Sequence, residues 1–102
     1  QRLQVATGSA RLLPWGPERV HQLGLITGGG GAELARAAAL GVDTFLTGEG
    51  PHWTDGLARD LGMNVLYGGH YATETFGVRA LGAHLERTFG LPWTFLDLPS
   101  GL

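Results

Sequence analysis

The chain has 102 residues, 43% of them hydrophobic and 16% charged, so it can form one globular core but not two domains. Its formal net charge of -2 argues against a nucleic-acid-binding surface, which usually needs a basic patch. It has no cysteine, and its seven basic residues are all arginines, which excludes disulfides, thiolate ligands and Schiff-base lysines.

Targeting and membrane signals are missing from the sequence. No apolar run approaches the ~20 residues of a membrane span, and no signal-peptide pattern opens the chain. We therefore expect a cytoplasmic protein with no membrane partner and no nucleic-acid partner. The chain starts at Gln1 and its single methionine is Met63, so we expect either that Gln1 follows a processing site or a cut, or that the chain is part of a longer protein.

Hydrophobic periodicity and glycine positions divide the chain into alternating elements. In chain order the expected elements are a strand over residues 3–7, a connection over 11–18, a strand over 19–27, a helix over 32–40, a strand over 42–47, a helix over 52–61, a strand over 64–67, a helix over 71–89 and a strand over 93–96. Gly41, Gly62 and Gly90 follow the three helices, where glycine commonly ends a helix.

This element order, β-β-α-β-α-β-α-β, predicts the α/β class. Strands that alternate with helices form right-handed crossovers and a mostly parallel sheet. We expect a three-layer α/β/α arrangement in which residues 1–102 form a single domain. In such sheets the carboxyl ends of the strands meet at one edge, where ligands bind. We therefore expect one crevice lined by Glu49, His52, His70 and Glu74.

His70 and Glu74 stand four residues apart at the start of the longest expected helix. Residues at this spacing lie on one helix face, so an imidazole nitrogen and a carboxylate oxygen can converge on one cation. Val78, Leu81 and Leu85 continue the same stripe. A carboxylate on a core-facing stripe is costly unless it is paired or bound to metal. The alternative is a simple hydrogen bond between the two side chains in a partly wet crevice.

Four consecutive glycines, residues 28–31, precede the first expected helix. Their amide groups could bind a phosphate, which makes Gly28 and Gly29 candidate substrate-binding residues. The run does not match a dinucleotide fingerprint or a Walker A loop, and close packing of helix against strand is the slightly favoured interpretation. Glu49 is a candidate ligand, ligand-orienting residue or solvated turn residue, and His52 is either a site residue or a plain helix start.

Four segments together carry a resemblance to a known family. They are residues 26–31 (ITGGGG), 41–49 (GVDTFLTGE), 69–74 (GHYATE) and 97–102 (DLPSGL). In this order they resemble the C-terminal half of the Nif-three-like family, proteins similar to NGG-one interacting factor three that are often labelled type-two GTP cyclohydrolase I homologues. The segment from Gly69 to Glu74 is the most specific of the four.

The resemblance implies a dinuclear metal site. The histidine and glutamate that are metal ligands in the family correspond to His70 and Glu74, and the metals would be two divalent ions such as zinc, manganese, iron or magnesium. The family's remaining ligands, an adjacent histidine pair and an aspartate from the N-terminal half, have no counterpart here. The resemblance thus implies that a missing N-terminal half or another chain completes the site, and that the parent is a homo-oligomer, a hexamer in the family.

The function implied in this way is half of the metal site of a metal-dependent hydrolase that acts on a phosphate-containing or nucleotide-like substrate. Whether the chain belongs to an enzyme is left open. The alternative is a non-catalytic metal- or nucleotide-binding module that assembles with partner proteins.

Overall fold

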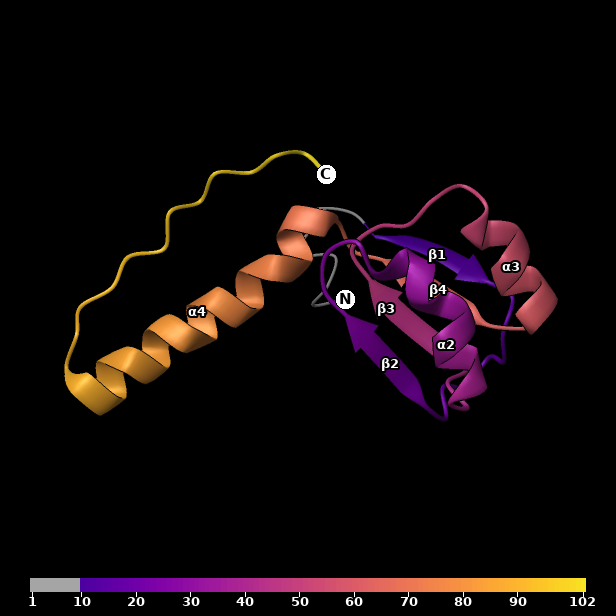
Figure 1. Ribbon diagram of the computed structural model, residues 1–102, viewed down its shortest axis with the longest axis horizontal. Helices are drawn as coiled ribbons and strands as arrows, with labels where there is room; N and C mark the ends of the chain where they lie inside the picture. Colours follow the sequence, from indigo (N-terminus) through magenta and orange to yellow (C-terminus); the bar gives the residue numbers. More distant parts are fainter. Residues whose placement is uncertain (1–9) are drawn as a thin grey trace.

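The computed structural model describes residues 10–102, so the strand expected over residues 3–7 lies outside the described residues. Four strands form one sheet of order β1-β4-β3-β2 (Figure 1). The strands are β1 (Arg11–Pro14), β2 (Leu23–Ile26), β3 (Thr44–Thr47) and β4 (Asn64–Tyr67). The helical elements are the 3₁₀ turn η1 (Gly30–Glu33) and the α-helices α2 (Leu34–Ala39), α3 (Thr54–Leu61) and α4 (His70–Phe89).

The predicted α/β class with a mostly parallel sheet is confirmed. β2, β3 and β4 are parallel neighbours, and β1 pairs antiparallel with β4. The crossovers through α2 and α3 step across the sheet in the same direction, so right-handed connections place both helices on one face, where they pack against each other. All three parallel strands therefore end at one edge, as expected.

The core lies between this helical layer and the sheet. Phe45 and Val65 stand side by side on β3 and β4, and Leu34 and Ala58 cover them from α2 and α3. Met63, which follows α3, completes the buried cluster. Each of these five residues is at most 2% exposed. Burial of this small apolar cluster holds both helices on the sheet.

The expected connection over residues 11–18 is wrong in its first part, because residues 11–14 form β1. Pro14 ends this strand opposite Asn64, and β1 is an edge strand with β4 as its single neighbour. An edge position tolerates proline because no ladder bond is lost on the outer side. The Pro and Gly residues between 14 and 17 mark the end of a strand here and not the middle of a loop.

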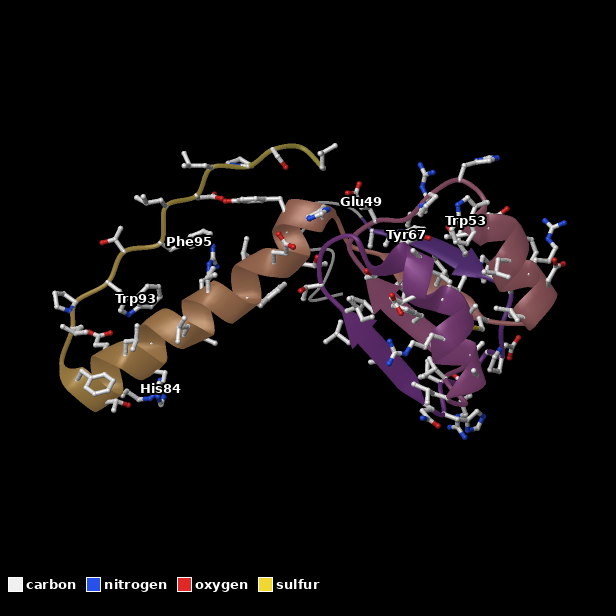
Figure 2. All side chains as sticks on the ribbon, viewed as in Figure 1. Glu49, Trp53, Tyr67, His84, Trp93 and Phe95 are labelled. Atoms are coloured by element: carbon white, nitrogen blue, oxygen red, sulfur yellow. The ribbon has the colours of Figure 1, made fainter. Side chains whose placement is uncertain are left out.

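The expected strand over residues 93–96 is also wrong. The segment is extended but unpaired, and it runs back along α4 from the far end of that helix (Figure 1). Trp93 packs on Gly82 and donates its indole N–H to Glu86, 3.0 Å away. The guanidinium of Arg79 lies 4.2 Å from the ring centre of Phe95. Figure 2 shows both rings between the tail and the helix. The aromatic residues Trp93 and Phe95 therefore pack against α4.

Helix ends follow the glycine pattern. Gly62 and Gly90 have left-handed backbone angles directly after α3 and α4. The first expected helix is shorter than predicted, because residues 30–33 form a 3₁₀ turn before α2. Among residues 10–102, no helix combines the length and the apolar character needed to cross a bilayer.

Candidate functional site

Hydrogen bonds tie the three strand-to-helix junctions together at the carboxyl edge of the sheet. Gly28 donates its N–H to the hydroxyl of Thr73 at 2.9 Å and accepts the N–H of Glu49 at 3.0 Å. Gly69 donates its N–H to the carbonyl oxygen of Gly48 at 2.8 Å. The glycine loop, the loop after β3 and the start of α4 are thereby fixed against one another.

Three side chains meet at this edge. The Nδ1 atom of His70 lies 2.6 Å from a carboxylate oxygen of Glu49, and its Nε2 atom lies 3.3 Å from a carboxylate oxygen of Glu74. The His70 side chain is 37% exposed, Glu49 47% and Glu74 54%, so the group is open to solvent on one side. Figure 2 shows Glu49 beside the first turn of α4.

The two carboxylates bind opposite nitrogens of the ring. An ion bound to Nε2 could therefore also be bound by Glu74 but not by Glu49. The two atoms that could bind the same ion are Nε2 and a carboxylate oxygen of Glu74. Among residues 10–102 no three histidine, cysteine or acidic side chains converge as a complete metal site. In metal sites, a carboxylate often accepts the N–H of the histidine nitrogen that does not bind the metal. Glu49 contacts Nδ1 in the same way, on the side of the ring away from Glu74.

The protonation of His70 follows from these contacts. The hydrogen bond to Glu49 raises the pKa of His70 above 6.5; partial desolvation opposes it, and the negative charge of Glu74 adds to the rise. In the neutral ring, a proton held on Nδ1 by Glu49 leaves the Nε2 lone pair facing the carboxylate of Glu74. Two acceptors at this distance repel, so the pair needs either a proton or a cation between them.

Gly28 brings its backbone close to this pair. Its φ of 73° is in the left-handed region, and a Cβ atom there would collide with the Glu74 carboxylate and lie 3.2 Å from Nε2 of His70. Any other residue would therefore be strained and would clash with the Glu74 carboxylate. The close approach of the backbone to this pair requires glycine at position 28.

The remaining expected site features separate into two groups. His52 is exposed in the turn before α3 and stands apart from the His70 group. In the glycine run, Gly30 donates its N–H to Thr47 and Gly31 donates to the carbonyl of Glu49. Together with the Gly28 bond to Thr73, these contacts use the amides inside the fold, which favours close packing over a phosphate cradle.

Comparison with known proteins places this geometry in a family. The family model described as Duf34/NIF3 (NGG1p interacting factor 3) matches residues 1–100. The chain belongs to the NIF3 family. This agrees with the resemblance seen in the sequence motifs.

Relatives with the description "GTP cyclohydrolase 1 type 2 homolog" include a NIF3 protein of Deinococcus radiodurans, 46% identical over 99% of this chain and 39% of the relative. One from Treponema pallidum is 42% identical over 90% of this chain and 32% of its own length. The solved structure of TTHA1606 from Thermus thermophilus superposes with a TM-score of 0.89 at 45% identity, covering 99% of this chain and 41% of that one. This chain thus spans about two-fifths of such NIF3 proteins.

The sequence did not reveal the role of Thr73, which is 2% exposed in this NIF3 chain. Its hydroxyl accepts from Gly28 and donates to the carbonyl of Gly69, 2.8 Å away, so it joins the glycine loop to the start of α4. A threonine in the first turn of a helix, beside a glycine-rich loop, is the only signal of this role in the sequence. The partner of its hydroxyl depends on tertiary structure.

Proposed function

We propose that His70 and Glu74 supply two ligands of a divalent-metal site, and that further ligands come from another segment or chain. The observation that carries this proposal is the separation of 3.3 Å between Nε2 of His70 and a carboxylate oxygen of Glu74. Two ligands bound at 2.0–2.2 Å to a tetrahedral ion lie roughly 3.3–3.5 Å apart, which matches this separation.

Each nearby residue has a part in the proposed site. His70 and Glu74 hold the ion, while Glu49 keeps the proton on Nδ1 and so directs the Nε2 lone pair toward the ion. Gly28 keeps the approach free of side chains. Imidazole and carboxylate donors suit zinc, manganese and iron, and a carboxylate also suits magnesium.

The proposed activity of the complete protein is metal-dependent hydrolysis of a phosphate-containing or nucleotide-like substrate. The names of the relatives, which refer to a GTP cyclohydrolase, support a hydrolytic reaction on a nucleotide. A bound divalent ion would supply Lewis acidity and lower the pKa of a water. His70 and Glu74 would then act as ion-holding groups and would not transfer protons themselves.

Calorimetric titration with zinc and manganese tests the metal site. We expect weak binding by the 102-residue chain, because two protein donors are fewer than the three or four of stable sites. His70→Ala should abolish this binding, whereas His84→Ala should leave it unchanged, since His84 lies exposed farther along α4 (Figure 2). Equal binding by both variants would contradict the proposal.

A full-length relative tests the reaction. The Deinococcus protein should bind two ions, and replacement of its residue aligned with His70 should remove one or both together with hydrolysis of a nucleotide such as GTP. Metal binding without hydrolysis of any nucleotide tested would favour the non-catalytic module instead.

A further inference from the structure

A cavity of about 420 Å³ lies at the carboxyl edge of the sheet, where β1 begins and β4 ends. Arg11 and Tyr67 line it from the sheet. They are paired in the register of these antiparallel strands, so their side chains are on the same face. The hydroxyl of Tyr67 is hydrogen-bonded to that of Thr54, which fixes the ring. Pockets for small ligands have volumes of about 300–1,000 Å³, so the cavity is large enough for one.

The tail forms another wall of this cavity, to which it contributes Pro99 and Leu102. One residue at the start of α4 holds the tail in place. The hydroxyl of Tyr71 donates to Asp97 at 2.7 Å and accepts the N–H of Leu98 at 2.8 Å. The backbone N–H of Tyr71 donates to the backbone oxygen of Leu102 at 3.1 Å. Figure 1 shows the end of the tail beside the first turn of α4. The wall is therefore formed before any ligand binds.

The cavity is next to the proposed metal ligands. Gly48 and Gly69 both line it, and Gly69 directly precedes His70 in the chain. A Cβ atom on Gly48 would lie 2.7 Å from the Cα atom of His70, so the two backbones are in close contact. The side chains of His70, Glu49 and Glu74 do not line the cavity. The two sites are thus neighbours along one edge of the sheet that share backbone and no side chain.

The charge of the cavity favours an anion. Arg11 is the single charged side chain among the described residues that line it. Among residues 10–102, no acidic side chain forms an ion pair with Arg11. The planar guanidinium group presents paired N–H donors whose geometry matches two oxygens of a phosphate group. The cavity therefore offers a phosphate group one positive charge and several hydrogen-bond donors, without an opposing carboxylate.

We propose that this cavity binds the phosphate group of the substrate through Arg11. The inference rests on the proposed function, which calls for a phosphate-containing or nucleotide-like substrate. It adds a substrate-binding residue on β1, an element that contributes none of the proposed metal ligands. It also assigns a task to Tyr71, which positions the tail as a wall of the binding site. Phosphate binding and metal binding are then carried by different side chains.

NMR titration of the 102-residue chain with guanosine monophosphate (GMP) in metal-free buffer tests the site. We expect the amide resonances of Gly48, Gly68 and Gly69 to shift, because these residues line the cavity. Inorganic phosphate should shift the same amides. Guanosine, which lacks the phosphate group, should bind at least about tenfold more weakly. Equal binding of GMP and guanosine, or no shift of these amides, would overturn the proposal.

Arginine variants test the assigned residue. Arg11→Gln should weaken GMP binding at least about tenfold, because it removes a charged donor of the phosphate group. Arg87→Gln is the matched control, since it removes the same charge from the last turn of α4, outside the cavity. The amide spectra of both variants check that they are folded. Equal losses in the two variants would show that GMP responds only to the net charge, and would overturn the role of Arg11.

A tyrosine variant tests the tail wall. Tyr71→Phe keeps the ring but removes the hydroxyl that Asp97 and Leu98 contact. We expect GMP to bind several-fold more weakly to this variant, with the tail amides shifted even without GMP. Shifted tail amides together with unchanged affinity would overturn the assignment of the tail to the binding site.

Zinc titration separates this proposal from that of the metal site. Arg11→Gln should bind zinc as the wild type does, and His70→Ala should bind GMP in metal-free buffer as the wild type does. Loss of zinc binding in His70→Ala, with GMP binding that is insensitive to Arg11→Gln, would overturn the phosphate site and leave the metal site standing. GMP binding that depends on Arg11, in a chain that binds no zinc, would support the phosphate site and contradict only the metal site.

Discussion

Gly28 is the residue at which backbone conformation and the proposed site are most tightly linked. Gly28→Ala should weaken zinc binding at least tenfold, because the new methyl group would clash with the Glu74 carboxylate and displace it from His70. Calorimetric titration measures the loss. Gly29→Ala is a close control, since its Cβ would make an ordinary contact of 3.5 Å with the His70 ring. Equal losses in the two variants would contradict this role of Gly28.

Glu49 makes the largest contribution to the raised pKa of His70, through its hydrogen bond to Nδ1. In the metal-free chain, Glu49→Gln should lower the pKa of His70, because a neutral amide stabilises the imidazolium less than a carboxylate does. Titration of the His70 ring resonances by NMR measures the shift. The resonances of His84 serve as an internal control, and an unchanged or raised pKa of His70 would show that Glu49 does not hold the ring.

Asp43 links the start of β2 to β3. Its carboxylate accepts N–H groups from His21 and Gln22 at 3.0 and 2.9 Å, and the Thr44 hydroxyl at 2.9 Å. Desolvation acts to raise the pKa of Asp43, but these hydrogen bonds outweigh it and lower the pKa below 3.8. A carboxyl whose pKa is lower in the folded state than in the unfolded chain stabilises the fold above its unfolded pKa.

The free energy of unfolding should therefore fall as the pH drops from about 5 through the folded pKa of Asp43. In Asp43→Asn this part of the pH dependence should disappear, and the variant should be less stable than the wild type at pH 7. Urea unfolding at several pH values measures both effects. If the free energy of unfolding of Asp43→Asn falls with pH as steeply as that of the wild type, other carboxyl groups cause the acid sensitivity.

At the scale of elements, the contact between the tail and α4 depends on one helical glycine. A Cβ at Gly82 would come within 2.5 Å of the Trp93 ring. Gly82→Ala should therefore displace the tail and shift the indole N–H resonance of Trp93, which hydrogen-bonds Glu86. Gly77→Ala gains the same helix propensity, about 1 kcal/mol, but its Cβ would meet nothing within 4 Å. An unmoved Trp93 resonance in Gly82→Ala would contradict this packing.

The sequence predicted those elements whose local pattern and tertiary role agree. The strand over residues 64–67 is found at the expected bounds, and the longest helix begins one residue early, at His70. The wrong predictions concern segments whose structure depends on a contact with another part of the fold. β1 forms because it pairs with the edge of β4, and the aromatic tail forms no strand because Trp93 packs on α4 at Gly82.

The same distinction holds for the candidate site. The i, i+4 spacing was enough to bring His70 and Glu74 together, because helix geometry is local. The contact of Glu49 with Nδ1 required the pairing of β3 with β4 in a fixed register, which spacing alone does not give. His52, also placed near a strand end, is exposed in the turn before α3, which starts two residues later.

At the scale of the whole molecule, packing is uneven. A compact chain of this length has a radius of gyration of about 13 Å, whereas the radius of gyration here is 15.4 Å. The excess comes from α4 and the tail, which extend beyond the sheet (Figure 1). β3 and β4 lie in the interior of the sheet with buried side chains, while among residues 10–102 the outer half of α4 has only the tail as a neighbour.

Amide hydrogen exchange should follow this difference. In dilute protein the amides of residues 79–89 should exchange at least tenfold faster than those of β3 and β4, because a 20-residue helix with little packing is marginal in water. Mass spectrometry of peptides from the two regions measures the rates. Slow exchange of both regions at every dilution would mean that α4 is stabilised within its own chain, which neither its direction nor its exposed leucines explain.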